Sequence, residues 1–251
     1  MKKLRVSMLA LMVMSAHITM AQEGSKSSYS VSLNQDNFFG FYPTIAGSLN
    51  INKNLDWTFY SILWTTPSFG TGGGGGLWTE FGTGVNFNTL NGKLKINPQI
   101  GFLNGKLLSN GAFPMLFEGV VPSLTANLGT DKLEGQFYLG YYTALRKGQV
   151  LSNDASRRLI DAPVQNNFLH WWANAGYKIS SAISAGVHYE HLRSNPSVGE
   201  SSNVYKWAGP YIQASLSNGL ALRFSGGSNV MDRPANDANN SFYKLTATFS
   251  F

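Results

Sequence analysis

The chain has 251 residues, no cysteine, 43% hydrophobic residues and only 13% charged residues. A soluble domain carries roughly 25% charged residues, so the charge is about half of what is usual. After the first 21 residues, no apolar run reaches the ~20 residues that a membrane helix needs. These values exclude a helical membrane protein, a disordered chain and a disulfide-stapled domain. The abundance of Gly and aromatic residues favours a single all-β domain instead.

The N-terminus has the pattern of a secretory signal peptide. A positive segment, Met1–Arg5, precedes a short apolar run, Leu9–Met14, and small residues precede a cleavage site after Ala21. We therefore expect export and a mature domain of residues 22–251. Removing the leader lowers the net charge from +6 to +3, so the sequence does not predict a nucleic-acid polymer as a partner.

The last ten residues alternate between apolar and polar side chains. Tyr243, Leu245, Ala247, Phe249 and Phe251 are separated by polar residues, which is the period of two expected for a strand with one apolar face. Residues 93–103, 133–145 and 167–179 alternate in the same way. The pattern predicts strands near 38–51, 55–65, 77–90, 93–104, 115–128, 133–146, 167–179, 182–194, 204–217, 220–230 and 241–251.

A further strand, Tyr29–Leu33, is included because membrane barrels made of one bacterial chain have an even number of strands. Tight connections are expected at 52–54, 91–92, 130–132, 180–181 and 218–219. Long connections are expected at 66–76, 105–114, 146–166, 195–203 and 231–240. The two kinds alternate, which is typical of an outer-membrane barrel with short periplasmic turns and long external loops.

The predicted fold is therefore a transmembrane antiparallel up-and-down β-barrel of about 12 strands. The alternative is a soluble β-sandwich, but aromatic residues such as Trp57, Tyr141 and Tyr177 lie on the apolar face near strand ends, as in membrane girdles. Four prolines fall inside predicted strands, at positions 43, 98, 122 and 210. Because proline cannot donate to a ladder, we expect each of them at a bulge or a strand end.

If the apolar face contacts lipid, the other face lines the lumen. The side chains predicted to line a solute path are Tyr60, Trp64, Trp78, Glu80, Lys95, Glu134, Tyr138, Tyr142, His170, Trp172, Trp207, Tyr211, Arg223 and Lys244. Aromatic faces and polar groups suit small aromatic or polar solutes, and about twelve strands leave room for a narrow pore. The alternative is a structural barrel whose lumen is plugged by these side chains.

The signal peptide, the alternating strands and the ending Tyr-x-Leu-x-Ala-x-Phe-x-Phe resemble Gram-negative outer-membrane barrels. That resemblance implies an outer-membrane location, contact with its lipid, and recognition of the strand ending at Phe251 by the barrel assembly machinery. Asp56-Trp57-x-Phe59-Tyr60, then Pro67-x-Phe69-Gly70 and a Gly-rich stretch before Trp78, is similar to an early hairpin of nucleoside-specific outer-membrane channels. This second resemblance implies passive transport through an aromatic-lined lumen.

An enzymatic alternative depends on the segment from His188 to Asn195. It is similar to the His-x-Ser-Asn motif of outer-membrane lipid A deacylases, with His191 as base and Ser194 as nucleophile. These residues are three apart, so a regular strand places them on opposite faces, and only a bulge at Arg193 would bring them together. The sequence has four His and no Cys, and its acidic residues are not clustered, so we expect neither a metal nor a cofactor.

Overall fold

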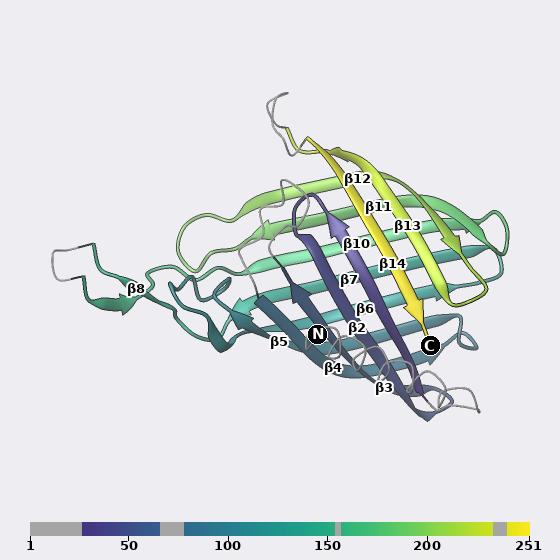
Figure 1. Ribbon diagram of the computed structural model, residues 1–251, viewed down its shortest axis with the longest axis horizontal. Coiled ribbons are helices and arrows are strands. Elements are labelled where there is room, and N and C mark those ends of the chain that lie inside the picture. Colours follow the sequence, from purple (N-terminus) through teal and green to yellow (C-terminus); the bar gives the residue numbers. More distant parts are fainter. Residues whose placement is uncertain (1–26, 66–77, 154–156, 233–239) are drawn as a thin grey trace, which may run out of the picture.

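The computed structural model describes residues 27–65, 78–153, 157–232 and 240–251, and within them twelve antiparallel strands close into a barrel (Figure 1). The predicted fold class is confirmed. The order around the barrel is β1-β14-β13-β12-β11-β10-β7-β6-β5-β4-β3-β2. The predicted signal peptide, residues 1–21, lies outside the described residues. Among the residues described, no helix is long and apolar enough to span a membrane.

The barrel strands are β1 Ser27–Asp36, β2 Gly40–Asn52, β3 Leu55–Trp64, β4 Trp78–Thr89, β5 Leu94–Gly105, β6 Met115–Gly129, β7 Leu133–Ala144, β10 Phe168–Lys178, β11 Ile183–Ser194, β12 Ser202–Ser215, β13 Leu220–Asn229 and β14 Ser241–Ser250. Every predicted strand is present, and the first is longer than expected. It pairs with both β2 and β14, so the count is even and the sheet closes. At the closure Phe251 N donates to Tyr29 O at 2.9 Å, and Tyr29 N donates back to Phe251 O at 3.3 Å.

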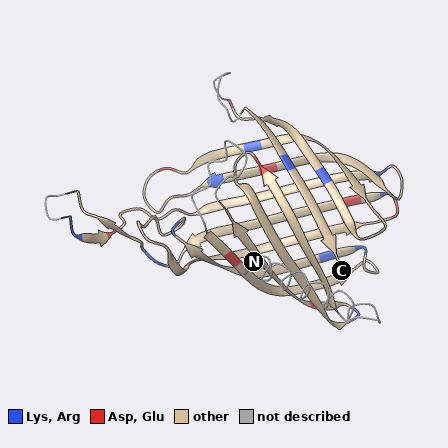
Figure 2. Cartoon of the chain, in the orientation of Figure 1, with Lys and Arg blue, Asp and Glu red and all other residues tan. Residues whose placement is uncertain are grey.

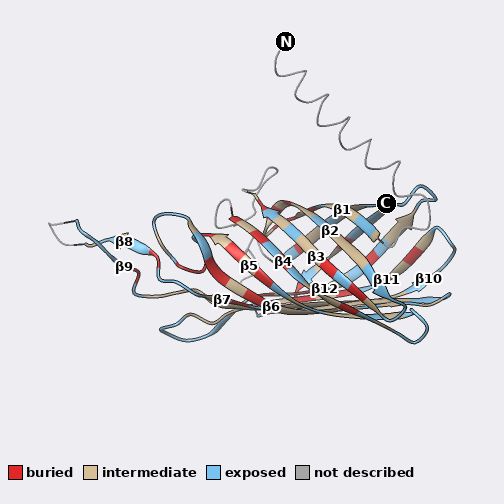
Figure 3. Ribbon diagram, turned by 90° about the horizontal axis from the view of Figure 1, so that it is seen from below, coloured by how far each residue is buried: buried red, intermediate tan, exposed pale blue. Residues whose placement is uncertain are grey.

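The outer wall of the barrel is apolar. Leu245 and Phe249 of β14 are 47% and 38% exposed, although both are large hydrophobic residues. The polar residues between them, Thr246 and Thr248, line the lumen. Figures 2 and 3 show few charges on the wall and exposed bands along its strands. An apolar exterior on a closed sheet is what the interior of a bilayer requires, and a soluble sandwich would expose the opposite face.

Three of the four strand prolines lie in gaps of the ladder and not at the expected bulges or strand ends, whereas Pro43 lies near the start of β2, as expected. Pro210 pairs with Val187 of β11, but the β12–β13 ladder has no pairs between Ala208 and Tyr211. Pro98 and Pro122 likewise pair on one side and lie in a two-residue gap on the other. The β2–β3 ladder begins only after Pro43. Because proline lacks an N–H, it has no donor of its own to lose on the open side, and the register is preserved across the three gaps.

The connections correct two sequence-based predictions. Tight and long connections do not alternate throughout, because β1 and β2 are joined at the long-loop end by only Asn37–Phe39, where the chain was expected to begin a strand at 38. The predicted loop 146–166 contains a two-stranded sheet, β8 Gln149–Leu151 paired with β9 Leu159–Asp161. This hairpin extends beyond the barrel wall (Figures 1 and 3).

Candidate functional site

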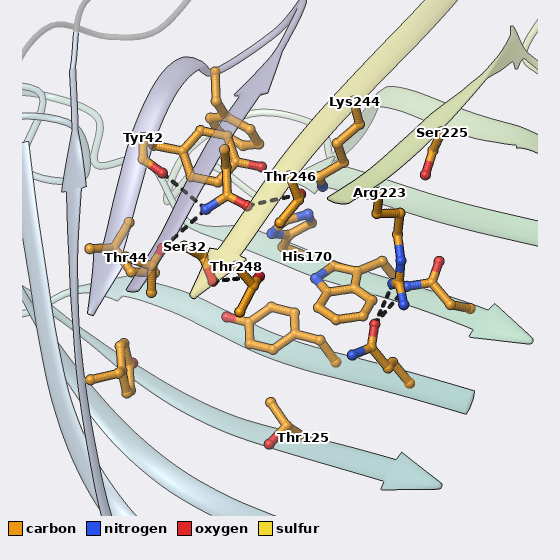
Figure 4. Close-up of a pocket in the computed structure, with 18 of the residues that line it drawn as sticks. Ser32, Tyr42, Thr44, Thr125, His170, Arg223, Ser225, Lys244, Thr246 and Thr248 are labelled. Atoms are coloured by element: carbon orange, nitrogen blue, oxygen red, sulfur yellow. Dashed lines mark hydrogen bonds between the residues drawn. The ribbon is translucent and has the colours of Figure 1, made fainter. Parts of the chain in front are cut away.

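The barrel lumen holds a cavity of about 390 Å³ (Figure 4). Its lining comes from all twelve barrel strands, because every strand turns alternate side chains inward. The volume lies within the roughly 300–1,000 Å³ of small-molecule sites. The cavity is therefore the candidate functional site, and the side chains around it fall into four groups.

The first group surrounds the carboxylate of Glu190, which is fully buried on β11. Lys244 Nζ lies 2.6 Å from Glu190 Oε2, and the Tyr205 hydroxyl donates to Glu190 Oε1 at 2.8 Å. His170 Nε2 and His188 Nε2 lie 2.9 Å and 3.2 Å from the two carboxylate oxygens. The Glu190 carboxylate neutralises the Lys244 ammonium inside the barrel, where an isolated ion would be costly.

The second group crosses the lumen. Arg223 Nη1 on β13 donates to Gln136 Oε1 on β7 at 2.5 Å, although three strands lie between them in the sheet. Arg223 Nε donates to Gln213 at 2.9 Å, and its guanidinium lies 4.7 Å from the centre of the Tyr211 ring. The Tyr211 hydroxyl in turn donates to Glu134 Oε1 on β7 at 2.7 Å. These contacts form a polar bridge between two sides of the barrel.

One amide joins the first two groups. Asn174 Nδ2 donates to Gln136 Oε1 at 3.1 Å, and Asn174 Oδ1 lies 2.7 Å from His188 Nδ1. The result is one hydrogen-bonded network from Lys244 through Glu190, His188 and Asn174 to Arg223. Figure 4 shows Lys244 and Arg223 directed into the cavity from neighbouring strands.

The third group is aromatic and lies flat against the wall. The Tyr60 hydroxyl donates to Glu80 Oε1 at 2.7 Å, and the Tyr138 and Tyr142 hydroxyls are 2.9 Å apart. Tyr138 stacks on Trp172 with ring centres 5.8 Å apart. The Tyr60 ring covers Gly101, where a Cβ atom would collide with its hydroxyl. Glycine on the neighbouring strands therefore permits the rings to lie against the backbone.

The fourth group is an aromatic layer at the loop end of the lumen, formed by Phe38, Phe39, Tyr42, Trp64, Trp78, Tyr205, Trp207 and Phe242. Trp64 stacks on Trp78 at 4.5 Å, and Tyr205 stacks on Trp207 at 3.9 Å. Phe38 and Phe39 of the β1–β2 turn join these two stacks, because Phe39 packs on Trp64 and Phe38 packs on Tyr205.

The β1–β2 turn is held in this position by Asp36. Its Oδ1 accepts hydrogen bonds from Phe38 N at 2.9 Å and Phe39 N at 2.6 Å, and Gly40 has the positive φ that ends the turn. Sequence reasoning did not single out Asp36 or Phe39 as site residues. The Asp-Asn…Gly spacing at 36, 37 and 40 is the signal that would have predicted a turn there.

Loop 106–114 is also anchored by a carboxylate that sequence reasoning did not select. Glu118 is fully buried and accepts from Leu107 N, Leu108 N and Ser109 N at 3.0–3.1 Å. This fixes the loop over the wall, with Leu108 packed into the core cluster beside Leu103 and Val121.

The structure places thirteen of the fourteen predicted solute-lining residues around the lumen, in three positions. Those that line the cavity are Tyr60, Trp64, Glu80, Tyr138, Tyr142, His170, Trp172, Arg223 and Lys244. Trp78 and Trp207 belong to the aromatic layer, and Glu134 and Tyr211 to the polar bridge. Lys95 is exposed near the turn end of β5, outside the cavity. Pro67, Phe69 and Gly70 of the channel-like segment lie outside the described residues.

His191 and Ser194 do not come together. The register shift near Arg193 places the extra residue, Val204, on β12, and β11 continues to pair regularly with β10 through both positions. The two side chains therefore point to opposite faces. Both ring nitrogens of His191 are engaged, Nδ1 by Trp171 Nε1 at 3.2 Å and Nε2 by Asn203 Oδ1 at 2.8 Å. The arrangement required of a nucleophile and its base is not present.

Within the described ranges, no group of three or more His, Asp or Glu side chains is placed to hold a metal ion. Glu190 is the nearest approach to such a group, but its oxygens already accept from Lys244 and Tyr205. The side chains that line the cavity can stack on a ring and form hydrogen bonds.

One protein-family model matches residues 1–251, which is the whole chain. The chain belongs to DUF6733, a family of unknown function. No curated protein matches the sequence. The family match covers the whole chain but names no function, so the fold comes from the structure.

Many solved structures match this chain, among them three that span 88–90% of it. The NanC porin is 11% identical over 88% of this chain and 98% of its own, with a TM-score of 0.49. An outer membrane channel of the COG4313 group from Pseudomonas putida F1 is 9% identical over 90% and 95%, with a TM-score of 0.48. A protein solved in a study of the in-meso crystallization of membrane proteins is 10% identical over 89% and 83%, with a TM-score of 0.52. At these identities, the likeness is one of fold.

Proposed function

We propose that this barrel lies in the outer membrane of a Gram-negative bacterium, after export by its signal peptide, and passively admits small aromatic or polar solutes. The observation that carries the proposal is the lumen cavity of about 390 Å³ with aromatic faces and polar donors around it. The apolar outer wall supports a membrane location, since lipid is the solvent that such a wall fits.

The lining supports selectivity by two interactions. Trp172, Tyr138 and Tyr60 offer ring faces to a planar solute, which stacking holds without demanding one hydrogen-bond pattern. Arg223 and Lys244 line the same cavity with N–H donors, whereas Glu190, the partner of Lys244, lies behind the lining. A solute with a flat ring and several hydrogen-bond acceptors, such as a nucleoside, suits both features.

The proposed path has a constriction at each end of the cavity. Phe38 and Phe39 cover the loop end, and the contact between Arg223 and Gln136 crosses the lumen. A solute would pass only when both the short turn and the long Arg223 side chain move. Small conductance with strong dependence on these side chains is therefore expected.

Single-channel recording of the refolded chain in planar bilayers tests the proposal. We expect small, reproducible conductance steps that nucleosides in the bath partly block. Trp172→Ala should weaken that block about tenfold, the equivalent of ~1–2 kcal/mol of stacking. Trp57→Ala, on the outer face, is the matched control and should leave the block unchanged.

The second candidate is a structural barrel with a plugged lumen. It is favoured by the same aromatic layer and by the polar bridge between β7 and β13. Flux into liposomes separates the two. If the folded wild-type chain passes no ions and no small solutes, the transport proposal fails and the plugged barrel stands.

A further inference from the structure

Part of the outer wall formed by β10, β11 and β12 has smaller outward side chains than the rest. A groove of about 480 Å³ lies there. Its outward side chains are mostly small, namely Ala173, Ala175, Val187, Tyr189, Ala208 and Pro210. Other strands present Leu, Ile and Phe at outward positions, as at Phe81, Ile100 and Phe224. The wall is therefore hollowed where bulky side chains are missing, and the ladder gap at Pro210 lies at the same place.

Two cationic side chains, Lys206 and Arg193, lie at the loop end of this groove. Trp207 is buried in the lumen, so its neighbours Lys206 and Ala208 point outward, and Lys206 lies one outward position beyond the groove residue Ala208. On β11, Arg193 is outward and exposed two residues beyond His191, which pairs directly with Lys206. No carboxylate in the described ranges forms an ion pair with Lys206 or Arg193.

The residues between the cations and the groove are held in place. Trp171 packs on Tyr189 with ring centres 4.8 Å apart, and it donates to His191, which contacts Asn203. This platform provides amphipathic rings at the level where the apolar wall meets the loops. Such rings sit at the headgroup region of a bilayer.

We propose that this surface binds one lipid whose phosphate headgroup carries a net negative charge, in the leaflet at the loop end of the barrel. Arg193 and Lys206 pair with the phosphate, and an acyl chain occupies the groove over Ala173, Ala208 and Pro210. The assignment follows from charge complementarity, because two cations on a lipid-facing wall, without a carboxylate partner in the described ranges, attract an anionic headgroup. The site lies outside the lumen, so it holds whether or not the barrel conducts.

Tryptophan quenching by brominated lipids tests this site. The chain is refolded in phosphatidylcholine vesicles, and phosphatidic acid or phosphatidylcholine with brominated acyl chains is added. The quenching of Trp171 is obtained as the difference in fluorescence quenching between the wild type and Trp171→Phe. That tryptophan borders the groove. We expect brominated phosphatidic acid to quench Trp171 at several-fold lower mole fraction than brominated phosphatidylcholine does.

Substitutions assign that preference to named side chains. Lys206→Ala and Arg193→Ala should each lower the preference for phosphatidic acid over phosphatidylcholine about fivefold, the usual contribution of one cation near a charged surface. Lys53→Ala, in the exposed turn at the opposite end, should leave it unchanged. Ala208→Leu should fill the groove and reduce quenching by the brominated chain. Each variant is first shown to be folded by its heat-modifiable mobility on gels.

Three results would overturn the proposal. Equal quenching by the two lipids in the wild type would show no headgroup recognition. A preference that survives the double substitution of Lys206 and Arg193 would place the site elsewhere. Displacement of the lipid by inorganic phosphate, but not by chloride at equal ionic strength, would show a site for the free ion instead of a lipid.

Discussion

Glu190 determines the charge arrangement in the lumen. Its carboxylate is fully buried and contacts Lys244, Tyr205, His170 and His188, so it organises groups from four different strands. A buried ion pair adds little net stability compared with an apolar pair, but removing one partner leaves an unpaired charge behind. Its structural role is therefore to hold Lys244 and the two imidazoles in fixed positions around the cavity.

Replacing Glu190 tests this role. Glu190→Gln removes the charge that neutralises Lys244, so we expect the free energy of unfolding to fall by about 3–5 kcal/mol. The measurement is urea unfolding in lipid vesicles, followed by fluorescence. Glu190→Gln/Lys244→Met should recover part of the loss because no unpaired ammonium remains. Glu200→Gln, an exposed carboxylate of the loop after β11, is the control. A single variant as stable as the wild type would contradict the argument.

Gly176 tests whether the lumen rings depend on glycine. A Cβ atom at this position would collide with the Tyr211 hydroxyl, which donates to Glu134. Gly176→Ala should displace Tyr211 and lower stability by about 1–3 kcal/mol, the usual cost of overpacking. Gly129→Ala is the matched control, because no other group lies within 4 Å of the place that its methyl group would take. The same unfolding measurement applies, and equal losses in both variants would refute a specific contact with Tyr211.

At the scale of elements, alternation predicted the strands because it depends only on which face each side chain takes. β14 and β10 show this clearly, since their outward and inward residues are those expected from the pattern. The β8–β9 hairpin was not predicted, because each strand has three residues and cannot show a period. The inward turn at Phe38 and Phe39 was missed for a related reason: two adjacent aromatics suit a strand as well as a turn.

The site was predictable only in part. The alternation assigned Glu134, Tyr211 and Arg223 to the inner face. However, the contact of Tyr211 with Glu134 joins residues 77 positions apart, and the contact of Arg223 with Gln136 joins residues 87 positions apart. Such contacts depend on how far neighbouring strands are staggered and on how the barrel curves. Neither quantity is encoded in the periodicity of one strand.

The C-terminal strand carries a prediction at this scale. β14 closes the barrel on β1, and Phe251 exchanges backbone hydrogen bonds with Tyr29. We propose that the barrel assembly machinery recognises this strand. Deleting Phe251 should slow assembly severalfold in vesicles that contain the purified machinery, while spontaneous folding in detergent stays close to the wild-type rate. The control is Phe113→Ala, an exposed loop aromatic. An equal delay with and without the machinery would indicate a folding defect instead of lost recognition.

For the whole molecule, the question is whether the lumen is a path or a closed interior. The aromatic layer and the polar bridge limit the cavity, and they differ in how firmly they are fixed. The bridge ends on the long side chain of Arg223, whereas the layer depends on a three-residue turn fixed by Asp36. A short turn whose two backbone N–H groups donate to the Asp36 carboxylate moves less readily than one side chain. The layer is therefore the stronger constriction.

Removing the two turn phenylalanines measures this constriction directly. Phe38→Ala/Phe39→Ala separates the Trp64 and Tyr205 stacks and opens the loop end of the cavity, so single-channel conductance should rise severalfold. Arg223→Ala should produce a smaller rise, because a single long side chain can move aside in the wild type as well. Phe224→Ala, an exposed position on the outer wall of β13, is the control and should not change conductance. If the double variant folds and conducts no more than the wild type, the layer does not limit flow. If both lumen variants remain closed, the interior is sealed by other contacts and the barrel is structural.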